Sequence, residues 1–198
     1  MRPGPILVLL SSLAAALPAA AFAADSGVSA KVTSTCQSCH GAGGNSTSGS
    51  VPRLNGQSAA YITARLHDLL DPTREDPHAT KTMWGVMNSV SSASFADIAA
   101  YYASQAPTQA GAAGANAGEG RRLFVHGAPG VPACQSCHGA SGQGGGSVPR
   151  LAGQHHEYLM NQLQRLQLGI RYSDTMHPTL KAMSDAQAAA IAAYLARD

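Results

Sequence analysis

The chain has 198 residues and is nearly neutral, with 13 Lys and Arg against 11 Asp and Glu and a formal net charge of +2. It has no basic patch of the kind that binds nucleic acid, so we expect no nucleic-acid partner. No stretch after the N-terminus reaches the roughly 18 apolar residues of a membrane-spanning helix, so we expect the mature chain to be soluble.

The first 23 residues have the pattern of a secretory signal peptide. A short positive segment, Met1 to Pro5, precedes an apolar run from Ile6 to Leu17 and the small-residue motif Ala21-Phe22-Ala23. This order predicts export, with cleavage near Ala23. The alternative is an uncleaved N-terminal anchor.

One pentapeptide occurs twice and contains all four cysteines. It reads Cys36-Gln37-Ser38-Cys39-His40 in the first half and Cys134-Gln135-Ser136-Cys137-His138 in the second. C-x-x-C-H is the attachment signature of c-type haem, with the cysteines as thioether links and the histidine as an axial ligand of iron. Two disulfides or a zinc site are the alternatives, but neither needs a repeated histidine. The motifs predict two covalently bound haem c groups.

The repeat extends well beyond these motifs. Val51-Pro52-Arg53-Leu54-Asn55-Gly56-Gln57 matches Val148-Pro149-Arg150-Leu151-Ala152-Gly153-Gln154, and each half ends on Ile-Ala-Ala-Tyr. We therefore expect a signal peptide (1–23), an N-terminal domain (24–107), a linker (108–117) and a C-terminal domain (118–198). The linker has no charge and no large apolar residue, which is typical of a flexible connector.

The apolar spacing predicts helices and no strands. Helical periodicity covers Ser58 to Leu70 and His156 to Leu168, with Gly169 as a stop signal. We also expect terminal helices at Ser94 to Ala103 and Asp185 to Ala196, the second capped by Ser184. The fold class is all-α, two tandem domains each wrapped around one haem.

The duplication selects a second axial ligand for each iron. The candidates were the methionine and histidine side chains downstream of each motif: Met83, Met87, His67 and His78 in the first half, and Met160, Met176, Met183, His155, His156 and His177 in the second. Met83 lies 15 residues before Ile98, and Met176 lies 15 before Ile191, so only this pair keeps a ligand in both copies. We expect both to lie in loops, with Met87, Met160 and Met183 filling the core. His78 and His177 remain the alternatives.

Two further pairs are expected near the haems. A backbone carbonyl near Pro52 or Pro149 could accept the Nδ1 proton of the axial histidine and fix its orientation. Arg53 and Arg150 follow directly and are candidates for pairing with haem propionates, the other reading being an exposed surface charge.

With these residues identified, the chain resembles the cytochrome c4 family, the dihaem class I cytochromes c of bacterial periplasms. The likeness rests on the two C-x-x-C-H-G motifs, the Pro-Arg-Leu-x-Gly-Gln segments, and Met83 and Met176. It also includes the run Gly120-x-x-Leu123-Phe124, which has no evident counterpart before Cys36. The resemblance implies two cytochrome c domains with His40 and Met83, and His138 and Met176, as axial ligands.

The resemblance also implies a periplasmic electron carrier rather than an enzyme. Its partners would be a quinol-oxidising complex or dehydrogenase upstream and a terminal oxidase downstream, with peripheral membrane association left open. The first alternative is an electron-transfer subunit of a periplasmic dehydrogenase or sulfur-oxidising complex. The second is a dihaem peroxidase, which would need an open iron site and is disfavoured by the matched methionines.

Overall fold

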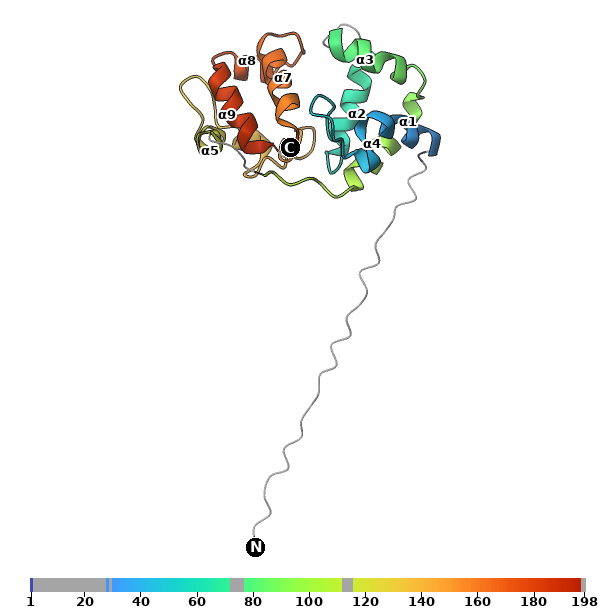
Figure 1. Cartoon of the computed structure of the whole chain (residues 1–198), viewed down its shortest axis with the longest axis horizontal. Helices are drawn as coiled ribbons and strands as arrows, with labels where there is room; N and C mark the ends of the chain where they lie inside the picture. The colour runs from blue at the N-terminus through green and yellow to red at the C-terminus, as the bar shows by residue number, and fades with distance from the viewer. Residues whose placement is uncertain (2–27, 29, 72–76, 112–115, 197–198) are drawn as a thin grey trace.

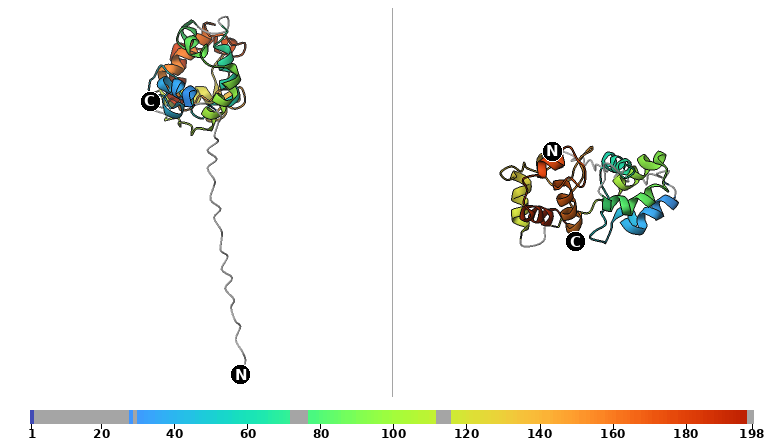
Figure 2. Two further views of the ribbon diagram at one scale, coloured as in Figure 1. Left: turned by 90° about the vertical axis from the view of Figure 1, so that its right-hand side faces the viewer. Right: turned by 90° about the horizontal axis from the view of Figure 1, so that it is seen from above.

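The computed structural model describes residues 1, 28, 30–71, 77–111 and 116–196, with the side chains of 30–33 and 77–80 left out. The predicted signal sequence and its cleavage site lie outside these ranges, as do residues 112–115 of the predicted linker. The helices form two groups that lie side by side as separate lobes (Figures 1 and 2).

The first domain, as the term is used below, comprises the helices before the linker: α1 Ala30–His40, η1 Ala42–Gly44, α2 Ala59–Asp68, α3 Pro77–Met87, η2 Ser92–Ser94 and α4 Phe95–Ser104. The second domain comprises those after it: α5 Ala117–His126, α6 Gln135–His138, α7 His156–Gln167, α8 Met176–Leu180 and α9 Asp185–Leu195. The helix α2 corresponds to α7, and α4 corresponds to α9, in their place in the duplicated sequence.

The all-α prediction is confirmed. Within the described ranges there is no β-strand, only isolated bridges such as Ala128 with Val131. No helix in this part of the chain is both long and apolar enough to cross a membrane.

The four helices predicted from periodicity are present, with ends within a few residues of expectation. The Ser58 hydroxyl accepts from the Tyr61 N–H and caps α2. Ser184 caps α9 in a reciprocal capping box with Gln187, as its sequence position suggested. The helix α7 ends at Gln167, and Gly169 follows in the left-handed region at a φ of 70°.

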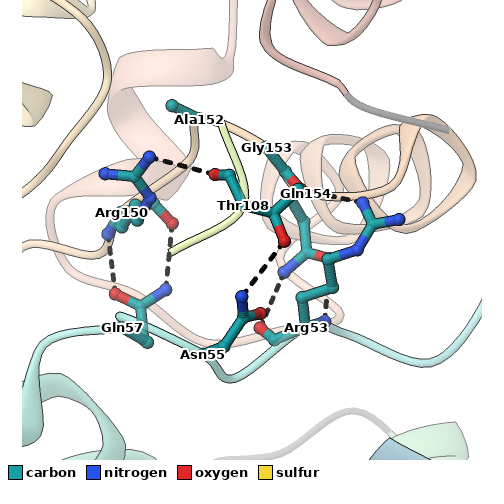
Figure 3. Close-up of a pocket in the computed structure, with 8 residues that line it drawn as sticks. All are labelled: Arg53, Asn55, Gln57, Thr108, Arg150, Ala152, Gly153 and Gln154. Atoms are coloured by element: carbon teal, nitrogen blue, oxygen red, sulfur yellow. Dashed lines mark hydrogen bonds between the residues drawn. The ribbon is translucent and has the colours of Figure 1, made fainter. Parts of the chain in front are cut away.

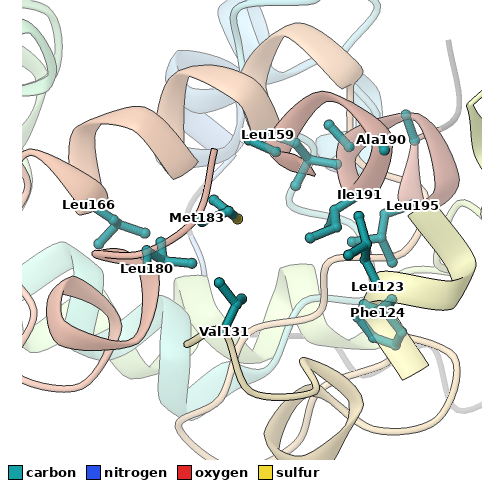
Figure 4. Packing of buried hydrophobic residues seen from close by; sticks show 13 residues of the cluster. Leu123, Phe124, Val131, Leu159, Leu166, Leu180, Met183, Ala190, Ile191 and Leu195 are labelled. Atoms are coloured by element: carbon teal, nitrogen blue, oxygen red, sulfur yellow. The ribbon is translucent and has the colours of Figure 1, made fainter. Parts of the chain in front are cut away.

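The core of the second domain is built where α5 crosses α9. Leu123 and Phe124 of α5 face Ile191 and Leu195 of α9 (Figure 4). Gly120 allows this approach, because a Cβ at that position would lie only 1.8 Å from the backbone oxygen of Ala190. Thirteen buried residues form this cluster, which extends through Val131, Leu159 and Leu166 to Leu180 and Met183.

The core of the first domain is smaller among the described residues. Its cluster has four buried members, Ile62 from α2 and Ile98, Ala99 and Tyr102 from α4. Val28, Cys36 and Leu54 pack against it as partly buried neighbours. The first domain therefore depends mainly on the α2–α4 contact.

The described part of the linker is anchored, which differs from the flexible connector that its composition suggested. Thr108 accepts from the side chains of Asn55 and Arg150, at 3.1 Å in both cases. The Gly111 N–H donates to the Ala196 oxygen at 2.9 Å. A chain without large side chains can still be fixed when its backbone groups find partners in both domains.

Candidate functional site

The two cysteine motifs occupy helix ends. Cys36 and His40 lie in the last turns of α1, whereas Cys134 is the N-cap of the four-residue helix α6, which ends at His138. Gly41 and Gly139 follow at φ of 77° and 81° and turn the chain away from each motif. Helical spacing brings the two thiols of each motif onto neighbouring turns.

All four thiols are free, as thioether attachment requires. Burial raises the pKa of the Cys36 and Cys134 thiols, so both are neutral rather than reactive thiolates. The described residues also contain no cluster of three or more histidine, cysteine or acidic side chains that could hold a metal ion. The zinc alternative therefore has no ligand set in this part of the chain.

The motif histidines are oriented by the carbonyls that the sequence suggested. His40 Nδ1–H donates to the Pro52 oxygen at 2.8 Å, and His138 Nδ1–H donates to the Pro149 oxygen at 3.0 Å. These bonds place the proton on Nδ1 and leave Nε2 with its lone pair. Burial lowers the pKa of both imidazoles, although the bonds to the proline carbonyls partly oppose this, and the neutral form is favoured.

The Nε2 atom of His138 is buried without a hydrogen-bond partner in the described part of the chain. A buried polar atom is costly unless it is satisfied, so an acceptor-type nitrogen in this position suits a metal ion. The donor set at each motif, two thiols and one neutral imidazole, therefore fits haem c.

The two predicted methionine ligands are half-buried, but the expectation that they lie in loops is wrong. Met83 lies within α3, and Met176 is the first residue of α8. A Ser173 hydroxyl accepts from the Met176 N–H at 3.0 Å and holds the start of that helix. Met176 packs on the second cluster together with Cys134 from the haem motif.

The other methionines behave as core residues. Met87 is 2% exposed and Met183 is 3% exposed, and Met160 packs against the second cluster. This agrees with the core-filling role predicted for them.

The remaining histidines have other partners or are not described. His67 makes an edge contact with the Phe95 ring at 5.0 Å. His177 Nδ1–H donates to the Leu166 oxygen at 3.0 Å, and His155 Nε2–H donates across the domain boundary to the Ser46 oxygen at 2.9 Å. The side chain of His78, the other alternative ligand, lies outside the described residues.

Arg53 and Arg150 lie where the two domains meet, and neither is fully exposed (Figure 3). Arg53 Nη1 donates to the Gly153 oxygen at 2.8 Å, and Arg150 Nη2 donates to the Thr108 oxygen at 3.1 Å. The Nε of Arg150 is buried without a hydrogen-bond partner among the described residues, and burial lowers the pKa of this guanidinium.

A reciprocal pair of glutamines joins the domains, and the sequence prediction did not assign them a role. Gln154 exchanges two hydrogen bonds with the backbone of Arg53, and Gln57 exchanges two with the backbone of Arg150 (Figure 3). We call these four bonds the glutamine clasp. The repeat of Gln at the same place in both copies was the signal that could have indicated it, because a duplicated chain can form a self-complementary interface.

Other bonds cross the boundary on either side of the clasp. The Ser58 hydroxyl donates to the Gly146 oxygen, and Arg171 Nη2 donates to the Tyr61 hydroxyl at 2.8 Å. The residues around the clasp leave a cavity of only about 10 Å³, which is barely room for one water. The two domains thus meet through a closely fitted polar interface.

Comparison with known proteins agrees with this geometry. The cytochrome c family model matches residues 117–197. Cytochrome c4 of Pseudomonas aeruginosa is 36% identical over 182 residues, which cover 87% of this chain and 88% of that protein. A thiosulfate dehydrogenase electron acceptor of Thiomonas intermedia is 35% identical over 172 residues, 82% of this chain and 77% of that protein.

Solved structures give the same result. The cytochrome c4 structure from Acidithiobacillus ferrooxidans superposes with a TM-score of 0.77 at 38% identity, covering 82% of this chain and 98% of that one. Together with the two haem-attachment motifs, these similarities establish a dihaem electron-transfer protein of tandem class I cytochrome c domains. The chain belongs to the cytochrome c4 family.

Proposed function

We propose that the chain is a periplasmic carrier whose two haems both have closed His/Met coordination. His40 with Met83 would hold the first iron, and His138 with Met176 the second. The observation that carries this proposal is the matched geometry of the histidines, each donating from Nδ1 to the carbonyl of the proline in its own domain. Half-buried methionines at equal distances from the terminal helices support it.

The chemistry that bound haem c supplies is one-electron exchange at iron. The protein's contribution is to fix the ligands and exclude others. A thioether sulfur favours the ferrous state and raises the reduction potential. Two protein ligands leave no position for substrate, so this coordination favours transfer of electrons over turnover and disfavours the dihaem peroxidase alternative.

We further propose that Arg53 and Arg150 pair with haem propionates. The guanidinium of Arg150 is largely withdrawn from solvent, and its bonded partner is the uncharged Thr108 carbonyl rather than a carboxylate. A planar guanidinium pairs best with a carboxylate, which a propionate provides. Arg53 occupies the matching position in the first domain and also bonds a backbone carbonyl.

The donor and acceptor are assigned by family likeness. We propose export through the predicted signal sequence and delivery of electrons to a terminal oxidase, with a quinol-oxidising complex or a dehydrogenase as the source. The cytochrome c4 relatives support a freely diffusing carrier.

A second candidate is favoured by one specific observation. A relative with similar coverage is named as the electron acceptor of a thiosulfate dehydrogenase. The same two domains could therefore serve a sulfur-oxidising dehydrogenase, either as its acceptor or as its bound subunit. Affinity capture from periplasmic and membrane fractions separates the two: a stable catalytic partner indicates a subunit, whereas weak capture with an oxidase indicates the carrier.

Substitution of each proposed methionine ligand tests the coordination. A methionine-ligated ferric haem has a weak sulfur-to-iron charge-transfer band, so Met83→His and Met176→His should each remove about half of that band. Met87→Leu is the matched control, because Met87 is buried in the core and its loss should leave the band intact. If either histidine variant retains the full band, the ligand assignment is wrong.

A further inference from the structure

The peptide group between Pro52 and Arg53 is hydrogen-bonded on both sides to functional partners. Its carbonyl accepts from His40 Nδ1–H at 2.8 Å. Its N–H, which belongs to Arg53, donates at 2.9 Å to the side-chain oxygen of Gln154 in the second domain. One planar peptide thus links the motif histidine of the first domain to a side chain of the second.

The same arrangement occurs in the opposite direction. The carbonyl of the peptide between Pro149 and Arg150 accepts from His138 Nδ1–H at 3.0 Å. Its N–H donates to the Oε1 of Gln57 in the first domain at 2.7 Å. Each motif histidine is therefore connected through two hydrogen bonds and one peptide group to a glutamine of the other domain.

Both glutamines are held in one orientation. Gln57 and Gln154 are each 7% exposed. Each Oε1 also accepts from the next backbone N–H, that of Ser58 or His155, at 3.0 Å. Each Nε2 donates to an arginine carbonyl of the other domain, Arg150 at 2.9 Å and Arg53 at 3.0 Å. Because these partners are backbone groups with fixed polarity, a flipped amide would oppose donor to donor, so the orientation is determined.

Hydrogen bonds in such a chain polarise one another. When a peptide N–H donates to a buried acceptor, the carbonyl of the same peptide becomes a stronger acceptor. A stronger acceptor draws the Nδ1 proton of the histidine and makes the imidazole a better electron donor through Nε2. A better donor stabilises ferric iron, so the glutamine is expected to lower the reduction potential of the haem in the other domain.

We propose that Gln57 and Gln154 are positioning residues through which each domain sets the reduction potential of the haem in the other. This inference rests on the proposed axial roles of His40 and His138. It explains why the Gln of the Pro-Arg-Leu-x-Gly-Gln segment is present in both copies, and why the clasp is made to the backbone of the residue that follows the histidine-binding proline. The docked arrangement of the domains is then part of the redox site rather than only its support.

The test is a crossed pair of substitutions in the full-length holoprotein. Gln154→Leu should raise the potential of the first haem and leave the second unchanged, and Gln57→Leu should do the reverse. Spectroelectrochemical titration gives the two potentials, and NMR signals of His40 and His138 followed through the titration assign each to its domain. The Nδ1–H signal of the affected histidine should also move toward that of a weaker hydrogen bond.

Tyr61→Phe is the control, since it removes a bond across the same boundary that does not involve either proline–arginine peptide. If Gln154→Leu does not fold, Gln154→Met keeps the length of the side chain and removes the amide. The inference is overturned by a shift in the variant's own domain, by equal shifts in both haems, by no shift, or by an equal effect of Tyr61→Phe. The methionine charge-transfer band, recorded on the same samples, shows separately whether the proposed coordination holds.

Discussion

The two domains hold the same haem motif on different scaffolds. In the first domain the motif ends a continuous eleven-residue helix, α1, and the described core is a four-residue cluster between α2 and α4. In the second domain the motif forms its own short helix, α6, and the separate helix α5 packs across α9 in a core of thirteen residues. The cytochrome c family model matches only the part of the chain that forms the second domain.

The histidine geometry is nevertheless the same in both. The distances from Nδ1 to the proline oxygen differ by only 0.2 Å, 2.8 against 3.0 Å. The comparison teaches that the ligand geometry depends on the motif, the proline segment and the clasp, whereas the size of the surrounding core can vary. We therefore expect the second domain to be the more stable one and the first to rely more on its haem and on the interface.

The largest effect is expected where α5 meets α9. Gly120→Ala would put a Cβ about where the Ala190 oxygen lies, so we expect a loss of at least about 3 kcal/mol in the stability of the second domain. Gly118→Ala on the same helix is the control, because a Cβ there meets nothing within 4 Å and should gain up to about 1 kcal/mol of stability from helix propensity. Denaturant unfolding followed by circular dichroism in the haem absorption region measures both. Equal stabilities for the two variants would refute the close packing.

A matched pair of core truncations should have a somewhat smaller effect. Ile98 and Ile191 stand at equivalent positions, and each is 3% exposed. We expect Ile191→Ala to cost about 4 kcal/mol and Ile98→Ala about 2 kcal/mol, because the larger cluster collapses less readily around the cavity. Separate unfolding transitions for the two domains would report both values. A larger loss for Ile98→Ala would reverse the proposed order of stability.

The smallest expected effect concerns the start of the terminal helices. Ser184 caps α9 through its side chain, whereas Ser94 at the start of α4 makes no side-chain capping bond. Ser184→Ala should lower the thermal stability of the second domain by about 1 kcal/mol, and Ser94→Ala should leave the first nearly unchanged. Calorimetry of the holoprotein compares the two, and a clear loss for Ser94→Ala would contradict this difference.

Much of the site could be predicted because it is local or duplicated. The cysteine motifs, the proline carbonyls and the Ser184 cap depend on residues close in sequence, and the Met83–Met176 pair was found by comparing the two copies. The loop expected around these methionines was wrong, although Pro77 at the first position of α3 is a common helix-start signal.

The glutamine clasp could not be predicted in the same way. Its bonds join residues about 100 positions apart, and they form only once two folded domains have taken one relative orientation. The sequence shows that Gln57 and Gln154 are repeated, but it does not show which backbone groups lie opposite them. The anchoring of Thr108 was missed for the same reason, because its partners come from both domains.

The central claim is that both irons are closed by protein ligands and that the chain carries electrons. Spectroelectrochemical titration of the wild-type holoprotein, repeated under carbon monoxide, tests it most directly. We predict two one-electron steps at high potential whose positions and ferrous spectra do not change with carbon monoxide. A carbon monoxide complex at either haem, with the matching upward shift of that step, would show an open iron site and contradict the assignment.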